Sequence, residues 1–171
     1  MYTKIHNFKI LHKYANFMNV CIGGTFDILH KGHKLLIDKA FETAGEEGYV
    51  FIGIMDKNIV DKNRRISSFE KRKKSVAEYI RYKNTSTYFL IKPIYDKYGP
   101  SLEEEFDAIV VSPETKSTAK EINRIRKYNK KKPLKIIEIS FVLARDNKPI
   151  SASRIRQGEI DEEGEILRWR D

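Results

Sequence analysis

The sequence predicts an α/β protein built on a doubly wound parallel five-stranded sheet. Five short apolar runs alternate with segments whose apolar residues recur at helical spacing, and glycines or prolines separate several of them. Strands that alternate with helices pair in parallel through right-handed crossovers, and such sheets bind ligands at the carboxyl ends of their strands. We therefore expect the functional residues to lie in the turns that follow the strands.

Two strands and two helices are expected in the first half of the chain. The strands are the apolar runs Val20–Ile22 and Tyr49–Met55. Between them, residues 34–46 carry a helical stripe made of Leu36, Ile37, Ala40, Phe41 and Ala44. The second helix is predicted to begin with a capping box, in which Ser67 pairs with Glu70, and to end near Tyr82.

The second half is predicted to add three strands, at residues 87–94, 107–112 and 134–141. A turn at Gly99–Ser101 leads toward the fourth strand, which Pro113 stops. A helix at 115–129 links the last two strands and ends at Lys130–Pro133. After the fifth strand, another helix is expected to start within Pro149–Arg156.

Composition narrows the class of protein. The 171 residues suffice for one domain with a buried core, which we place at residues 19–171, with residues 1–18 as an N-terminal extension. The net charge of +9 suits either nucleic-acid binding or an enzyme whose substrates are polyanions. The single cysteine, Cys21, reads as a small buried hydrophobe, and the lack of a membrane span or signal core indicates a cytoplasmic protein.

The segment from Cys21 to His33 carries the densest chemistry in the chain. It places a strand, a glycine turn, two histidines and a helix start within thirteen residues. Gly23 and Gly24 let backbone N–H groups approach a ligand, and a helix beginning at Gly32 or His33 would aim its unpaired N–H groups at the same place. His30 and His33 stand three residues apart and could both donate to an anion, so the pattern predicts a pocket for a phosphate chain.

A second candidate anion site follows the fifth predicted strand. Pro149–Arg156 is a serine-rich helix start, in which the hydroxyls of Ser151 and Ser153 and free backbone N–H groups can bind phosphate oxygens. Arg154, three residues after Ser151, can add a charged fork. The loop after the second strand is also basic, because it contains Lys57, Lys62, Arg64 and Arg65.

Both candidate anion sites match signatures of one superfamily. Gly24-Thr25-Phe26-Asp27 followed by His30-Lys31-Gly32-His33 resembles the first signature of the nucleotidyltransferase superfamily of cytidylyl- and adenylyltransferases. Ile150 to Arg154 resembles the second, with Ala152 where a serine is common. Two more segments, Ser67–Arg72 and Val111–Thr115, resemble one branch, the archaeal phosphopantetheine adenylyltransferases. The resemblance covers roughly residues 19 to 158.

The resemblance implies both a fold and a reaction. The fold is the Rossmann-like nucleotidyltransferase fold. The reaction transfers AMP from ATP to 4'-phosphopantetheine and gives dephospho-coenzyme A and pyrophosphate, a step of coenzyme A biosynthesis. ATP and 4'-phosphopantetheine would be the partners, Mg²⁺ would arrive with ATP, and no protein metal site is expected. The acceptor phosphate would attack the α-phosphorus in line, without a covalent enzyme intermediate.

The resemblance also implies roles for individual residues. The nucleotide site would comprise two groups, Gly24, Thr25, Phe26, His30, Gly32 and His33 in the first motif and Ser151, Ser153 and Arg154 in the second. His30 and His33 would be catalytic and donate to α- and β-phosphate oxygens. A lysine after the second strand would bridge the two substrates; Lys62 is the first choice, Arg64 the second, and Thr25 would also contact the acceptor.

Two other readings stay open at the level of sequence. Transfer could go to another phosphorylated acceptor, such as nicotinamide mononucleotide, flavin mononucleotide or a cytidylyl acceptor. The charge of +9 and the runs Lys71–Lys74 and Lys130–Lys132 could instead belong to an RNA-binding module. Those runs fall on a helix face and at a helix end, where solvated lysine is ordinary, and no aromatic stacking motif accompanies them.

Overall fold

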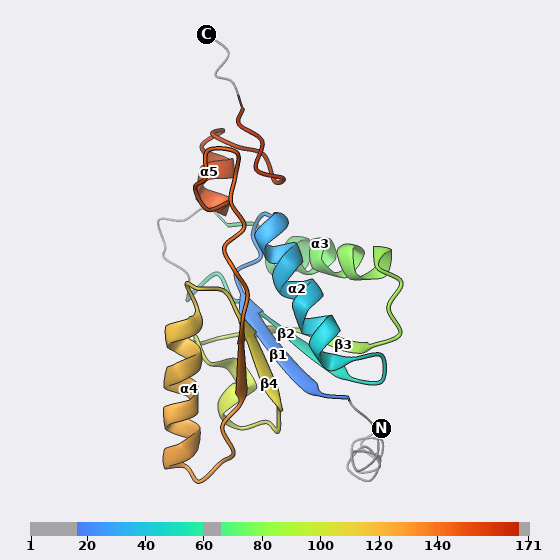
Figure 1. The fold of residues 1–171 in the computed structure, drawn as a ribbon, viewed down its shortest axis with the longest axis vertical. Coiled ribbons are helices and arrows are strands. Elements are labelled where there is room, and N and C mark those ends of the chain that lie inside the picture. The colour runs from blue at the N-terminus through green and yellow to red at the C-terminus, as the bar shows by residue number, and fades with distance from the viewer. Residues whose placement is uncertain (1–16, 60–65, 168–171) are drawn as a thin grey trace.

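The computed structural model describes residues 17–59 and 66–167, and its described part contains a sheet of five parallel strands (Figure 1). The strands are β1 (Asn19–Gly24), β2 (Tyr49–Met55), β3 (Tyr88–Ile94), β4 (Ala108–Val111) and β5 (Lys135–Glu138). The helices are α2 (Lys31–Ala44), α3 (Phe69–Tyr82), the short 3₁₀ helix η1 (Gly99–Leu102), α4 (Lys116–Tyr128) and α5 (Ala152–Arg156). The predicted order of strands and helices is confirmed.

The strands lie in the order β3-β2-β1-β4-β5, which confirms the doubly wound parallel sheet. The chain runs outward from β1 through β2 to β3 and then returns to β4, on the other side of β1. The winding direction therefore changes between β1 and β4, and sheets of this kind bind ligands in the crevice at the carboxyl ends of the strands beside that point. Gly23 and Gly24 end β1, and the two histidines follow it, so that all four residues lie at this edge.

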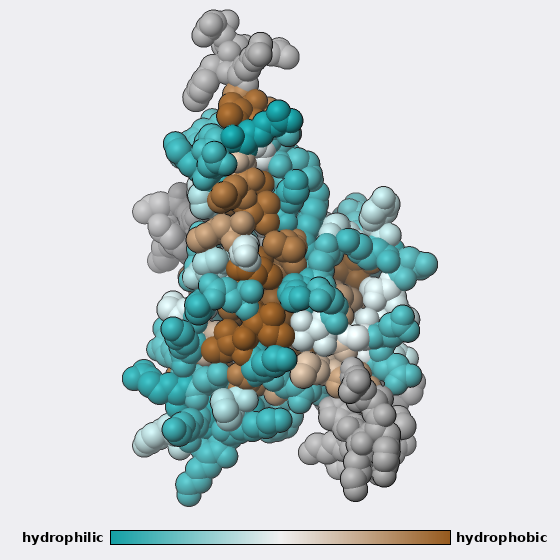
Figure 2. All heavy atoms as spheres, in the orientation of Figure 1, coloured by the Kyte–Doolittle hydropathy of each residue, from teal (hydrophilic) through white to brown (hydrophobic). Residues whose placement is uncertain are grey.

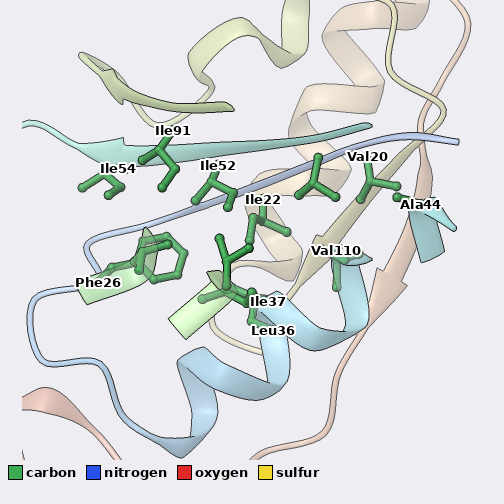
Figure 3. Close-up of a cluster of buried hydrophobic side chains, with 14 of the residues drawn as sticks. Val20, Ile22, Phe26, Leu36, Ile37, Ala44, Ile52, Ile54, Ile91 and Val110 are labelled. Carbon is green, nitrogen blue, oxygen red and sulfur yellow. The ribbon is translucent and has the colours of Figure 1, made fainter. Parts of the chain in front are cut away.

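Alternate residues of the strands feed two apolar cores, one on each face of the sheet. Val20 and Ile22 of β1 face α2 and α3, whereas Cys21 between them faces α4 and η1. Figure 3 shows the first core, in which side chains of β1, β2 and β4 meet Leu36 and Ile37 of α2. Cys21 is 4% exposed and its burial raises the pKa of the thiol to about 12, so it packs as a small hydrophobe, as predicted.

The N-terminal cap of α3 differs from the prediction by one residue. Ser68, rather than Ser67, is the N-cap, and its hydroxyl accepts a hydrogen bond from the Lys71 N–H, so the predicted Ser67–Glu70 capping box is wrong. Ser67 is instead held by its backbone, because its N–H donates to Asp27 and its carbonyl accepts from Arg72. Tertiary contacts thus shifted the start of the helix.

Beyond β5 the chain leaves the sheet and forms a small separate core. The fifth strand is shorter than predicted, ending at Glu138. Ile139 still packs in the first main core, and the small core that follows comprises Ala144, Ile150 and Ile160, with Val142 and Ile155 packed against them. This C-terminal segment lies beyond the start of α2 in Figure 1. Figure 2 shows hydrophobic atoms along the middle of the face that carries the segment. Its exposed apolar side chains are Phe141, Leu143, Ile166 and Leu167.

Within residues 17–59 and 66–167, no helix has both the length and the apolar character needed to cross a membrane.

Candidate active site

The turn after β1 is fixed by a buried phenylalanine in an uncommon backbone conformation. Phe26 has φ 49°, in the left-handed region that residues other than glycine seldom occupy, and its side chain is fully buried in the first core (Figure 3). A Cβ on Gly24 would meet the Phe26 ring at 3.1 Å, which explains the glycine. Apolar burial of the ring offsets the backbone strain, so that the turn is rigid before any ligand arrives.

His30 forms the N-terminal cap of α2 with its imidazole ring. The Gly32 N–H donates to Nδ1 of His30 over 3.1 Å, and a Cβ on Gly32 would meet the ring at 3.1 Å. The helix therefore begins at Lys31, one or two residues earlier than predicted. Because Nδ1 accepts this bond, neutral His30 carries its proton on Nε2 and can donate from there.

His33 has the opposite tautomer. Its Nδ1 lies 3.0 Å from the carbonyl oxygen of Ile28, and a carbonyl can only accept, so the proton is on Nδ1 and neutral Nε2 has a lone pair. The two imidazole rings are stacked, with centroids 3.9 Å apart and planes at 22°. In the free protein, His30 is thus a donor at Nε2, whereas His33 needs a second proton to become one.

Both histidines are neutral at physiological pH in the free protein. Burial, together with the charges of the neighbouring His33 and Lys34, lowers the pKa of His30 to about 3. Burial also lowers the pKa of His33 to about 4, although the Ile28 carbonyl and Asp27 favour its charged form. Stacked rings oppose a charge on both at once. The site is therefore built to hold at most one additional proton.

The first N–H groups of α2 are less open than the sequence suggested. The Lys31 N–H donates to the carbonyl of Glu162 over 3.0 Å, and the Gly32 N–H is occupied by His30. The expected row of unpaired donors is therefore partly closed by the protein itself. The partial positive charge of the helix end remains, and the imidazole rings are the side chains there that can donate hydrogen bonds to an anion.

Asp27 joins the first motif to two distant parts of the chain. Its carboxylate is 4% exposed, accepts from the Ser67 N–H over 2.7 Å, and pairs with the Arg156 guanidinium over 2.8 Å. Arg156 lies 129 residues away, on α5. This ion pair brings the first and second motifs together. Sequence reasoning did not single out Arg156, and the signal for it was only a second arginine after the serine-rich helix start.

The second motif has the predicted cap but an occupied arginine. Ser151 is the N-cap of α5 and accepts from the Arg154 N–H over 3.4 Å. The Arg154 guanidinium is already paired with Asp146 and, over 2.8 Å, with Glu159. Ser153 lies on the first turn of the same helix. In this state Arg154 ties the C-terminal segment together, and a phosphate would have to compete with two carboxylates for it.

Two predicted residues, Lys62 and Arg64, lie outside the described residues. Of the others, Thr25 lies next to the strand ends, with its hydroxyl 4.0 Å from the sulfur of Met55 at the end of β2. Lys57, in the turn after β2, is exposed. The structure therefore places a phosphate-contact candidate, Thr25, beside the start of the basic loop.

A cavity of about 180 Å³ opens beside the same strand ends, on the face covered by α4. Gly23, Gly24 and Gly53 form part of its floor, and the walls include Tyr98, Thr115 and Thr118. A Cβ on Gly53 would meet Ile94 at 2.9 Å, so a larger residue does not fit there unless Ile94 moves. The cavity is mostly apolar, and the residues that line it include Ser101, Thr115 and Thr118. No cluster of three or more His, Cys, Asp or Glu side chains able to hold a metal ion occurs in the described part of the chain.

The fold and the site define an α/β protein of the nucleotidyltransferase type. A glycine turn and two neutral histidines lie at the winding change of a parallel sheet, and a second anion motif is tied to them. The chain belongs to the cytidylyltransferase-like family, whose profile matches residues 21–158. That match spans both motifs.

Individual relatives agree with this assignment. A phosphopantetheine adenylyltransferase of Methanosarcina acetivorans is 45% identical over 150 residues, covering 87% of this chain and 96% of the relative. One from Archaeoglobus fulgidus is 38% identical over 151 residues, covering 88% of this chain and 100% of the relative. A solved structure of a protein with unknown function from Archaeoglobus fulgidus gives a TM-score of 0.65 at 34% identity, over 71% of this chain and 89% of that chain.

Proposed function

We propose that this protein is a phosphopantetheine adenylyltransferase, which transfers AMP from ATP to 4'-phosphopantetheine and releases pyrophosphate. One observation carries the proposal: relatives with that name are 38–45% identical over 86–88% of the chain. The geometry agrees, because a rigid turn, a histidine pair and a second anion motif meet at one sheet edge. Nucleotidyl transfer demands this kind of positioning more than a reactive side chain.

In the proposed reaction an oxygen of the acceptor phosphate forms a bond to the α-phosphorus of ATP. The bond between the α-phosphorus and the bridging oxygen breaks on the opposite side, and that oxygen leaves with pyrophosphate. Negative charge builds up on the α-phosphate oxygens and on the leaving group. The protein must therefore align two anions and stabilise this charge.

His30 and His33 fit that demand in different ways. Neutral His30 already has a donor at Nε2, as its cap to Gly32 requires. His33 becomes a donor at Nε2 only when it takes up a proton, and the charge of a bound triphosphate favours that uptake. We therefore propose that His33 takes up a proton when ATP binds. The protonated ring then donates a hydrogen bond from Nε2, and this bond becomes stronger as negative charge develops in the transition state.

The other site residues keep the roles that the family resemblance implies. Gly24, Thr25, Phe26 and Gly32 shape the phosphate turn, and Ser151, Ser153 and Arg154 bind the β- and γ-phosphates. Lys62, or in its place Arg64, bridges the substrates, together with Thr25. ATP is used as its Mg²⁺ complex, in which phosphate oxygens and water hold the metal. We also propose that residues 1–18 precede the catalytic domain and that the protein works in the cytoplasm.

The cavity beside β1 and β2 is proposed to receive the pantetheine arm. A volume of about 180 Å³ is below the roughly 300–1,000 Å³ of common ligand pockets, which suits a slender chain better than a flavin ring system. Thr118, a hydroxyl-bearing residue of its lining, is a candidate partner for the amides of the arm. This geometry favours phosphopantetheine over a mononucleotide acceptor.

The test is a pyrophosphate-release assay with purified protein, ATP, Mg²⁺ and 4'-phosphopantetheine, with dephospho-coenzyme A identified by mass. Pantetheine without its phosphate is the matched control, since it keeps the arm and lacks the nucleophile. We expect CTP to be a poor donor, and flavin and nicotinamide mononucleotides to be poor acceptors. If either mononucleotide reacts at least as efficiently by kcat/KM, the acceptor is wrong while nucleotidyl transfer stands.

A further inference from the structure

Arg72 is a charged side chain inside the protein. It lies on the first turn of α3 and is 1% exposed, so nearly all of the guanidinium has been removed from water. Burial of a charge is costly unless hydrogen bonds replace those lost to solvent. The described acceptors of Arg72 are all backbone carbonyls, and each belongs to a different segment around the candidate active site.

Three hydrogen bonds connect Arg72 to these segments. Nη1 donates to the carbonyl of Thr25 over 2.7 Å and to that of Met55 over 2.8 Å. Nε donates to the carbonyl of Ser67 over 2.9 Å. Thr25 is in the phosphate turn, Met55 ends β2, and Ser67 precedes α3. A rigid guanidinium can reach all three at once, whereas the single ammonium group of a lysine lacks that fixed fork.

The bonds of Arg72 form a closed network with the first motif. Ser67, whose carbonyl accepts from Arg72, donates its N–H to Asp27 over 2.7 Å. Asp27 is two residues after Thr25, whose carbonyl accepts from Arg72 as well. The strained Phe26 stands between them, and strained backbone persists only where its surroundings hold it. The network holds the backbone on both sides of that residue.

We infer that Arg72 is a positioning residue for the proposed adenylyl transfer: it fixes the Thr25 turn against the end of β2, so that the phosphate contacts of the first motif are in place before substrates bind. The inference rests on the proposed function for its kinetic consequence. Its structural part, that Arg72 holds the turn, stands independently. Misplacement of a reacting group by about 1 Å can cost about 100-fold in rate.

The chain contains a matched control in Arg126. It is also fully buried, with Nη1 donating to the carbonyls of Ser101 and Glu104, and Nε to that of Lys132. In both arginines, Nη2 has no hydrogen-bond partner among the described residues. Arg126 binds segments that precede β4 and β5, at the opposite edge of the sheet from the phosphate turn. Loss of either arginine should destabilise the fold alike, but only loss of Arg72 should disturb the turn.

The experiment compares Arg72→Met and Arg72→Lys with Arg126→Met and Arg126→Lys, at a temperature where melting curves show each variant folded. We expect Arg72→Met to lower kcat by about 100-fold, Arg72→Lys to lose less, and Arg126→Met to stay within threefold of wild type. The lysine variants provide the comparison if either methionine variant does not fold. Equal loss of kcat in the Arg72 and Arg126 variants would overturn the inference.

Hydrogen exchange tests the structural part without reference to the reaction. Amides of residues 24–28 should exchange at least tenfold faster in the Arg72 variants and at the wild-type rate in the Arg126 variants. Unchanged exchange in this segment would refute the positioning role even if activity fell. A wild-type protein that makes no dephospho-coenzyme A would instead refute the proposed function, and the exchange result would still decide the role of Arg72.

Discussion

The two anion motifs are held in place by different kinds of interaction. The first is anchored in the main core, where the fully buried Phe26 fixes the turn and the His30 ring caps α2. The second lies on a short helix of the C-terminal segment, which has only a small core of its own. Its arginines are held by ion pairs, Arg154 with Asp146 and Glu159, and Arg156 with Asp27.

The first motif is therefore expected to be rigid, whereas the second can change its partners. Packed apolar cores are close to rigid, so the first motif presents its histidines in one arrangement. Ion pairs at a partly exposed surface contribute little stability and can be exchanged for other anions. The first motif is therefore suited to the bond-changing α-phosphate, whereas the second is suited to grip the outer phosphates after giving up carboxylate partners.

The largest effect is expected for a substitution in the first, rigid motif. His33→Ala should lower kcat by about 10² to 10⁴ with little change in ATP affinity, because its hydrogen bond strengthens as charge develops. Steady-state kinetics and calorimetric ATP titration measure the two quantities. Lys39→Ala, on the same helix and paired only with Glu42 in the described contacts, is the control. A His33 variant within threefold of wild type in kcat would remove the residue from the mechanism.

Replacement of Arg154 in the adjustable motif should act on binding instead. We expect Arg154→Ala to raise the KM for ATP by about 10- to 100-fold, with kcat nearly unchanged, because a charge-assisted hydrogen bond contributes about 1.5–3 kcal/mol in ground and transition states alike. Arg145→Ala removes a more exposed ion pair, with Glu165, from the same segment and should have little effect.

Asp146→Asn tests whether the carboxylate of Asp146 competes with phosphate for Arg154. If the carboxylate competes with phosphate for the guanidinium, this variant should bind ATP at least as tightly as wild type. A rise in the KM for ATP equal to that of Arg154→Ala would mean that the arginine serves the fold of the segment and not the nucleotide.

The buried histidines also predict how stability depends on pH. The pKa values of His30 and His33 are about 3 and about 4, below the unfolded value of about 6.5, so the unfolded chain binds more protons between pH 6.5 and 4. The stability that the two neutral histidines contribute is complete above pH 6.5 and is lost as the pH falls. Each histidine should lower the free energy of unfolding by about 2 kcal/mol when the pH falls from 7 to 5.

Urea unfolding of wild type and His33→Asn at the two pH values measures this effect. The asparagine variant should lose about 2 kcal/mol less than wild type on going from pH 7 to pH 5, since it lacks one of the two titrating rings. Equal losses in the two proteins would mean that the pKa of His33 in the folded state does not lie below its unfolded value.

The smallest effect concerns the ion pair that joins the motifs. Arg156→Gln should raise the KM for ATP about two- to fivefold. Because the Asp27 carboxylate is 4% exposed, the loss of stability should exceed the value of about 1 kcal/mol that is usual for exposed pairs. Lys34→Gln, which breaks the ion pair of α2 with Glu163 of the C-terminal segment, is the comparison. Salt should narrow the difference in KM between wild type and Arg156→Gln, since it screens the pair. A difference independent of salt would contradict an electrostatic link.

The sequence by itself determined the order of strands and helices, the parallel sheet and the location of both motifs. Each of these depends on residues close together in the chain, such as the stripe in α2 or the apolar run Tyr49–Met55, whose predicted bounds match β2. Burial of Cys21 followed from its place between Val20 and Ile22 in the first strand. Short-range periodicity suffices for such inferences.

Only the tertiary structure decided how the site is held together. Arg156 reaches Asp27 across 129 residues, and Arg72 reaches Thr25 across 47, so no local pattern contains either contact. The same contacts moved the cap of α3 from Ser67 to Ser68, because Ser67 gives its backbone to Asp27 and Arg72. The histidine tautomers likewise depend on which backbone group each ring meets, and burial, which sequence does not measure, made both rings neutral.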